Sequence, residues 1–378
     1  MICSIDYTRV DLSEKKKATS GYILENLHSC NLFRVIGGSS ISVLINEEID
    51  KLLETTSRSF YPTLKYLPKK IRGQIGLLYL LARIADTIAD SKTGETEVLI
   101  DLITKYNDVA QGNSKELPEF SELSKIQENP AEAKLLLNVQ PVVDALEVYS
   151  KEDQQRMLEC LDIIIAGQVL DLQRFGIAKE GGTISSLDTE DELDDYTFRV
   201  AGCVGVFWTK MSLAHMFKPT NNNEEFFMEQ GIRFGKALQM INIMRDIPED
   251  LRFGRCYVPS PSLEKIGLTP ESLLQKDSIQ TFRPLYDSYL DITDAHLDAA
   301  IEYILMIPGI QFRSRAACML PVLVGQRTVS LLRKGNPLDS ERVIKVTRDE
   351  MKSYFKKIMK AMLVPGGVKR LLMKNKSL

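Results

Sequence analysis

The sequence contains few of the residues that build metal clusters or disulfide frameworks. Its six cysteines are scattered without a C-x-x-C pair, and its three histidines lie far apart in the chain. Scattered thiols indicate a reducing compartment and argue against a structural zinc site. Because the histidines do not cluster, we expect structural roles rather than metal binding for His28, His215 and His296.

Long apolar runs and a large net charge are missing as well. Asp, Gln or Pro interrupts each of the longest apolar runs before it reaches the roughly 20 residues that a membrane span needs. The first residues lack the basic and then apolar order of a secretory signal. The net charge of −3 provides no overall field that would attract nucleic acid. We therefore expect a cytoplasmic protein that binds no nucleic acid.

Helical periodicity is present along most of the chain. Apolar residues recur at helical spacing, and alternating strand patterns bounded by hairpin turns are missing. Gly, Pro, Asn and Ser-rich loops are expected between the helices, among them residues 117–130 and 259–272. The pattern predicts a single all-α domain, a helical bundle, over residues 41–350. Residues 1–40 are expected to form a loosely ordered N-terminal arm.

The last segment, residues 351–378, is expected to be a basic C-terminal helix or tail. It holds eight Lys and Arg residues and no acidic residue. Two interpretations fit this composition: a peripheral contact with an anionic membrane surface, and a frayed, solvated tail.

Two acidic pairs are the most informative local feature. In the stretch LYLLARIADTIAD, Arg83, Asp86 and Asp90 follow at steps of three and four, which places them on one helix face. The stretch LQMINIMRDIPED repeats the arrangement, with Arg245 next to Asp246 and with Asp250 four residues on. One D-x-x-x-D pair is usually a solvated helix face, and Pro248 tends to kink or end the second helix. Two such pairs inside apolar stretches, each with an arginine, are more specific.

Four carboxylates that face each other across a bundle core would repel one another strongly. A hard divalent cation removes that conflict, and Mg²⁺ prefers one or two carboxylates together with substrate phosphates. The two pairs therefore predict a Mg²⁺-bridged diphosphate, with arginines donating charge-assisted hydrogen bonds. Further phosphate donors are expected in SRS and RFGRCY, namely Ser57, Arg58, Ser59, Arg252, Arg255 and Tyr257.

Small and polar residues interrupt two further apolar segments. One segment contains Ala201, Gly202 and Gly205, and the other contains Gly167, Gln168 and Asp171. Small residues allow either close helix packing or room for a ligand, and both alternatives stay open. In the second case, an apolar tunnel beside the diphosphate site would hold a long isoprenoid chain.

Together these blocks resemble the squalene/phytoene synthase family. The similarity extends from about Ser57 to about Arg348 and comprises SRSF, YLLARIADTIAD, YTFRVAGCVG and LQMINIMRDIPEDLRFGRCYVP. The resemblance implies an all-α isoprenoid-synthase bundle with a central apolar cavity. It also implies an enzyme that joins two allylic prenyl diphosphates head to head.

The resemblance assigns roles to particular residues. It implies that Mg²⁺ (or Mn²⁺) is held by Asp86, Asp90, Asp246 and Asp250. It implies a catalytic group made of Tyr79, Arg83, Asp86, Tyr196 and Asp246. The diphosphates and the reacting chains are expected to contact Ser57, Arg58, Ser59, Phe60, Gln239, Asn242, Arg245 and Arg255.

The product is less closely defined. The DTIAD form of the first acidic pair and the long C-terminal helical part favour squalene synthase, which uses two farnesyl diphosphates, passes through presqualene diphosphate and needs NADPH. The family's basic K-x-R element is only partly matched, because Thr347 stands where its second basic residue is expected. Lys345 and Arg348 are the candidate NADPH contacts.

Three alternatives remain open. Without NADPH, the chain would be a dehydrosqualene or phytoene synthase, or would stop at presqualene diphosphate. A non-catalytic helical scaffold is the alternative of another class, but such a protein is expected to lose its acidic ligands. The sequence does not define the oligomeric state.

Overall fold

The all-α prediction is confirmed by the architecture. The computed structural model describes residues 45–57, 61–91, 95–177, 181–342 and 344–376. Within these residues the only sheet is one short parallel pair, β1 (Ser185–Ser186) with β2 (Arg255–Cys256). The predicted N-terminal arm, residues 1–40, lies outside the described residues, as do Arg58, Ser59 and Phe60.

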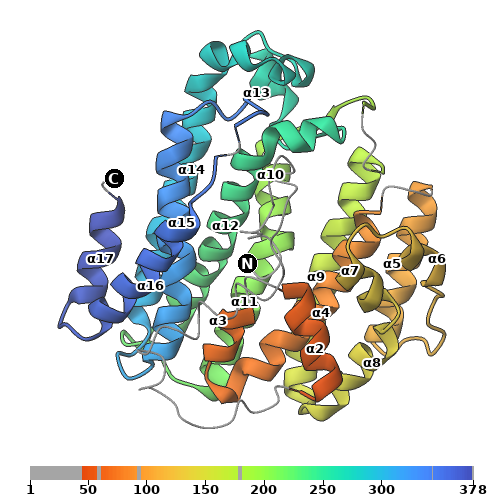
Figure 1. Cartoon of the computed structure of the whole chain (residues 1–378), viewed down its shortest axis with the longest axis vertical. Coiled ribbons are helices and arrows are strands. Elements are labelled where there is room, and N and C mark those ends of the chain that lie inside the picture. The colour runs from red at the N-terminus through yellow and green to blue at the C-terminus, as the bar shows by residue number, and fades with distance from the viewer. Residues whose placement is uncertain (1–44, 58–60, 92–94, 178–180, 343, 377–378) are drawn as a thin grey trace.

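Six long helices form the body of the molecule, and Figure 1 shows them roughly along its long axis. They are α4 (Lys69–Ala89), α9 (Lys151–Phe175), α11 (Cys203–His215), α12 (Glu224–Arg252), α14 (Ile279–Met306) and α15 (Phe312–Lys334). The other helical elements of the described residues are α2 (Glu47–Ser57), α3 (Tyr61–Tyr66), α5 (Thr96–Ala110), α6 (Ser121–Lys125), α7 (Pro130–Leu136), α8 (Val139–Asp144), η1 (Ala145–Val148), α10 (Glu190–Thr197), η2 (Phe198–Gly202), α13 (Ser260–Glu264), η3 (Pro270–Leu274), η4 (Lys276–Ser278), α16 (Arg348–Met362) and α17 (Gly367–Lys376).

Two predicted loops are in fact partly helical. Residues 117–130 contain α6, and residues 259–272 contain α13 and part of η3. Proline starts two of these short helices near the first turn, where its missing N–H costs nothing. The sequence signals for a turn and for a short proline-led helix overlap, which explains the error.

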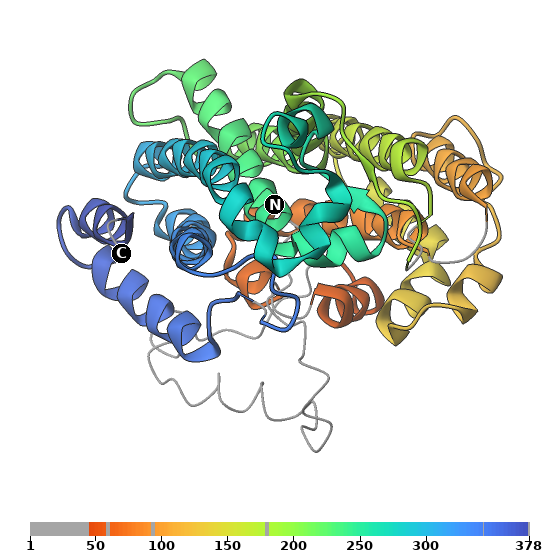
Figure 2. The ribbon, with the colours of Figure 1, turned by 90° about the horizontal axis from the view of Figure 1, so that it is seen from above.

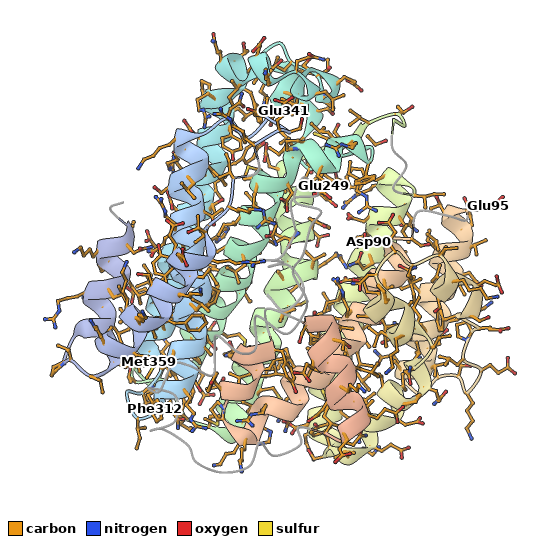
Figure 3. The ribbon with its side chains drawn as sticks, viewed as in Figure 1. Asp90, Glu95, Glu249, Phe312, Glu341 and Met359 are labelled. Atoms are coloured by element: carbon orange, nitrogen blue, oxygen red, sulfur yellow. The ribbon has the colours of Figure 1, made fainter. Side chains whose placement is uncertain are left out.

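Helix α4 lies at the centre because it is apolar on almost every side. Its buried residues include Leu77, Leu78, Tyr79 and Leu80, four successive positions that together point around the whole helix. Seen from above, α14 and α15 lie to the left of α12, and α5 lies to its right (Figure 2). In the view of Figure 3, Asp90, at the end of α4, lies to the lower right of Glu249, on α12. Helix α12 continues through Pro248 as far as Arg252.

Backbone contacts fix how α11 and the preceding π-helical segment η2 cross α12. A Cβ atom on Gly205 would lie 2.0 Å from the carbonyl oxygen of Gly231, and one on Gly235 would lie 2.1 Å from that of Ala201. Neither distance is compatible with a side chain. Of the two alternatives for these small residues, close helix packing is therefore the one realised at this crossing.

The C-terminal segment is not a frayed tail. Helices α16 and α17 pack against α15, and Tyr354, Ile358, Val368 and Leu372 are buried there. No helix in the described part of the chain is long and apolar enough to span a bilayer.

We predict that Gly205→Ala lowers the free energy of unfolding by about 3 kcal/mol, because its Cβ meets backbone that cannot yield. The matched control is Gly325→Ala on α15, whose Cβ would meet only the side-chain methyl groups of Ile241 and Leu297. That control should change stability by less than about 1 kcal/mol. Urea unfolding followed by far-UV circular dichroism measures both free energies of unfolding. Equal losses of stability in the two variants would contradict the conclusion that backbone contacts fix how α11 crosses α12.

Candidate active site

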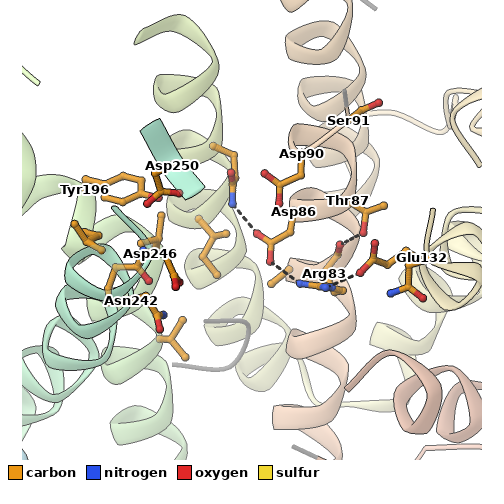
Figure 4. Close-up of a pocket in the computed structure, with 18 of the residues that line it drawn as sticks. Arg83, Asp86, Thr87, Asp90, Ser91, Glu132, Tyr196, Asn242, Asp246 and Asp250 are labelled. Atoms are coloured by element: carbon orange, nitrogen blue, oxygen red, sulfur yellow. Dashed lines mark hydrogen bonds and ion pairs between the residues drawn. The ribbon is translucent and has the colours of Figure 1, made fainter. Parts of the chain in front are cut away.

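The end of α4 forms one wall of a pocket and carries the first acidic pair. Asp86 accepts a hydrogen bond from Gln168 of α9 (Nε2–Oδ1 2.6 Å) and lies 3.9 Å from an Arg83 nitrogen. Arg83 also donates to Glu132 of α7 (2.6 Å), as Figure 4 shows. Asp90, the residue that follows α4, is mostly exposed, and its Oδ1 lies 3.5 Å from an Arg255 nitrogen.

The facing wall is the last part of α12, and it carries the second acidic pair. Gln239, Asn242, Arg245, Asp246 and Asp250 all line the pocket, and Figure 4 shows Asn242, Asp246 and Asp250 across from Asp86 and Asp90. The Nε of Arg245 donates to Asp246 Oδ1 (2.8 Å) and a second guanidinium nitrogen donates to Oδ2. Because the helix continues through Pro248, both aspartates of this pair reach the same pocket.

The pocket has a volume of about 660 Å³ and combines an acidic, arginine-containing part with apolar side chains. The apolar lining comes from α4, α9, α11, α12 and the η2 segment: Leu78, Ala82, Ile164, Val200, Val204 and Ile243. One end can therefore hold an anion with its counterions, and the other can hold a hydrocarbon chain.

A buried polar network adjoins the pocket, and two of its members, Tyr196 and Tyr257, line it. The ring of Tyr196 stacks on that of Tyr257 (centroids 4.6 Å apart), and its hydroxyl donates to the Tyr257 hydroxyl at 3.1 Å. Tyr257 in turn donates to Asp171 Oδ2 at 2.7 Å. Burial raises the pKa of Asp171 to about 6, although the charge of Arg255 acts in the opposite direction. Burial also raises the pKa of both tyrosines, so they remain protonated donors.

The small sheet places the C-terminal part of this network. Gly254 adopts a left-handed backbone (φ +83°), and its carbonyl accepts a hydrogen bond from Ser185 N–H at 3.0 Å. The chain then enters β2, which brings Arg255 to Asp90 and Tyr257 to Asp171. Burial alone would lower the pKa of Arg255, but its neighbours Tyr257, Asp90 and Asp171 outweigh it, so the guanidinium stays charged.

The donor set fits Mg²⁺. Six carboxylates line the pocket, the four aspartates of the two acidic pairs together with Glu128 and Glu132. The side-chain oxygen of Asn242 is buried there without a hydrogen-bond partner among the described residues. All are hard oxygen donors. Within the described ranges no three acidic, His or Cys side chains gather around one point, so an ion here would keep sites for other ligands. Mg²⁺ typically takes such a set, with diphosphate oxygens completing its shell.

Some predicted site residues lie elsewhere. The Tyr79 hydroxyl donates to the Thr56 carbonyl (3.2 Å), beside Ser57, and neither Tyr79 nor Ser57 lines the pocket. Lys345 lies in the connection before α16 and Arg348 begins that helix; both are exposed and do not line the pocket. The roles of these residues in the reaction, and those of Arg58, Ser59 and Phe60, stay predictions.

Other contributors had only a weak sequence signal or none. Gln168 and Asp171 stood out as polar interruptions of an apolar helix, and Tyr257 stood out beside the arginines, but their contacts were not predictable. Glu132 gave no signal, because it lies at the edge of a predicted loop and has the composition of a surface residue.

Comparisons with known proteins show the family and the fold of this chain. The squalene/phytoene synthase family model matches residues 53–350. A bifunctional lycopene cyclase/phytoene synthase of Podospora anserina is 29% identical over 235 residues, which are 59% of this chain and 36% of that protein. A 15-cis-phytoene synthase of Synechocystis sp. is 26% identical over 246 residues, 62% of this chain and 61% of that one. The chain spans little more than a third of the length of the bifunctional relatives.

Solved structures show the same fold. TcSQS in complex with the ligand BPH1237 superposes with a TM-score of 0.69 at 17% identity, covering 87% of this chain and 89% of that one. A dehydrosqualene synthase in complex with a ligand superposes with a TM-score of 0.59 at 18% identity, covering 84% and 95%. Because the family model matches most of its length, the chain belongs to the squalene/phytoene synthase family.

Proposed function

We propose that this chain is a Mg²⁺-dependent prenyltransferase of isoprenoid biosynthesis that joins two farnesyl diphosphates head to head, through presqualene diphosphate, to squalene. The observation that carries the proposal is the pocket between α4 and α12, with an aspartate pair on each wall and apolar side chains beside them. A diphosphate needs metal ions and cationic donors, and a prenyl chain needs apolar walls. This pocket offers both.

The polar end of the pocket would receive the diphosphates. Asp86 and Asp90 on one wall, and Asp246 and Asp250 on the other, would hold the Mg²⁺ ions. Bound Mg²⁺ would neutralise the charge that builds on a departing diphosphate. Arg83 and Arg245 line the same space and can donate charge-assisted hydrogen bonds to its oxygens.

The apolar end would protect the reaction from water. The first allylic diphosphate ionises, the C2–C3 double bond of the second attacks the resulting cation, and proton loss closes a cyclopropane. Side chains such as Leu78, Val204 and Ile243 exclude water that would quench the cation. The ring faces of Tyr196 and Tyr257, which also line the pocket, are suited to stabilise positive charge.

A hydride-free product of the dehydrosqualene or phytoene type is the second candidate. Two observations favour it. The relatives from Podospora anserina and Synechocystis are named phytoene synthases, and the candidate NADPH contacts Lys345 and Arg348 do not line the pocket. Squalene formation needs hydride from NADPH, so cofactor dependence separates the two candidates.

We predict that Asp86→Asn reduces Mg²⁺-dependent pyrophosphate release from farnesyl diphosphate by about 100- to 1000-fold, because one anionic metal ligand is lost. Asp101→Asn is the control, since Asp101 is exposed on α5, where it pairs with Lys105 one turn along the same helix. Pyrophosphate release is measured with both variants after circular dichroism has verified the fold. Near-normal release by Asp86→Asn would refute the assignment of this carboxylate.

A product assay decides between the two candidates. Purified protein, Mg²⁺ and farnesyl diphosphate should give squalene when NADPH is present and a dehydrosqualene-type product when it is not. The same assay with geranylgeranyl diphosphate tests chain length, and mass spectrometry identifies the products. A phytoene-type product that is unaffected by NADPH would support the second candidate instead.

The buried Asp171 should make stability depend on pH. Its pKa is raised from 3.8 to about 6 by burial, so folding favours the protonated form. That contribution is complete below about pH 4 and is lost as the pH rises through about 6, which amounts to about 3 kcal/mol. Asp171→Asn cannot ionise and still accepts the Tyr257 hydrogen bond. The stability of this variant relative to the wild type should therefore increase between pH 4 and pH 7, as measured by urea unfolding, and a pH-independent difference would contradict the shifted pKa.

A further inference from the structure

The C-terminal helices α16 and α17 form a hairpin that is firmly attached to α15. The buried side chain of Asn375 donates to the Leu323 carbonyl and to Gln326 Oε1, both at 3.1 Å, and accepts from the Tyr354 hydroxyl at 3.2 Å. Gln326 donates to the Leu372 carbonyl at 3.1 Å. Separating the hairpin from α15 would leave these buried polar groups without partners, which is costly. The turn between the two helices is therefore presented by a fixed support.

That turn exposes apolar side chains. Leu363 is 81% exposed and the adjacent Val364 is 49% exposed, whereas Ala361 before them and Val368 after them are buried. Single exposed leucines are common on protein surfaces. Two neighbours at the tip of an anchored hairpin are a different feature, because Figures 1 and 2 both show this turn at the outer edge of the molecule.

The surroundings of the tip are strongly basic. Residues 351–378 contain no acidic residue, and Lys356, Lys360, Lys369 and Arg370 are exposed on the two helices that lead to the turn. Three ion pairs of this hairpin, Lys352 with Asp349, Glu350 with Arg327 of α15, and Lys376 with Asp298, lie at the ends of the helices away from the turn. The exposed lysines and the arginine near the turn are therefore on the surface beside Leu363 and Val364.

We propose that this C-terminal tip, residues 356–370, docks on an anionic lipid bilayer. Leu363 and Val364 enter the boundary between head groups and acyl chains, and the flanking lysines contact lipid phosphates. An apolar insertion and a basic patch together are the two signals that give stable peripheral attachment. A lysine or arginine held near an anionic surface strengthens binding by roughly fivefold. A second copy of this chain is a poor occupant, because two basic tips without acidic residues repel each other.

The charge part of the proposal is tested with the full chain and phosphatidylcholine vesicles that contain or lack phosphatidylglycerol. The wild type should sediment with the anionic vesicles at low salt, and less so at high salt. The double variant Lys360→Glu/Lys369→Glu should bind them at least about tenfold more weakly. The matched control Lys105→Glu/Lys125→Glu makes the same charge change at exposed positions on α5 and α6, and should bind like the wild type. Equal binding of both vesicle types, or equal behaviour of the two variants, overturns the proposal.

The apolar part is tested separately. Leu363→Ser/Val364→Ser should weaken binding about tenfold. Its control is Leu137→Ser/Val148→Ser, at positions that are 62% and 67% exposed on the other side of the molecule. Leu363→Trp should show a blue-shifted emission with anionic vesicles, and the only native tryptophan, Trp208, is buried. Unchanged emission overturns insertion of the tip, and so does a concentration-dependent dimer without lipid that Leu363→Ser/Val364→Ser abolishes.

Discussion

The need to keep the four aspartates of the two acidic pairs around one pocket is the constraint on which the rest of the structure depends. Like charges at this density repel one another, and partly buried carboxylates need compensation. Three arginines provide it, and each comes from a different element. Arg83 of α4 lies beside Asp86, Arg245 of α12 holds Asp246, and Arg255 of β2 reaches Asp90. The acidic pairs can therefore face one another in a folded chain before any cation binds.

The surrounding fold fixes the positions of these aspartates and arginines relative to one another. The contact of Gly205 with Gly231, and of Gly235 with Ala201, leaves no room for the η2–α11 segment to slide along α12, so Tyr196 and the second acidic pair stay on adjoining walls. The short sheet does the same for Arg255 and Tyr257, which approach the pocket only because Gly254 turns the chain after α12. These two backbone features thus position side chains from α10, α12, β2 and the residue that follows β2.

Periodicity and the D-x-x-x-D spacing predicted both walls of the pocket, because a helix repeats on a scale that the sequence displays directly. They did not predict where the other side chains of α4 point, since a helix buried on all sides has no unique apolar face. Tyr79 illustrates this, because it turns toward Thr56 rather than into the pocket. Asp171 and Glu132 show a second limit. Their partners, Tyr257 and Arg83, lie 86 and 49 residues away, and only tertiary packing brings such pairs together.

The ion pairs of Arg83 and Arg245 also indicate how the same arginine donors can serve the pocket without substrate and the pocket with bound diphosphate. Arg245 donates hydrogen bonds from two guanidinium nitrogens to Asp246, and Arg83 donates one to Glu132. In the proposed reaction, cations take over the charge compensation of the aspartates, and the arginine donors become available for diphosphate oxygens. Because Glu132 is no predicted metal ligand, Arg83 would keep that partner while it binds the anion. The carboxylate of Glu132 would then orient the guanidinium of Arg83 in the proposed complex.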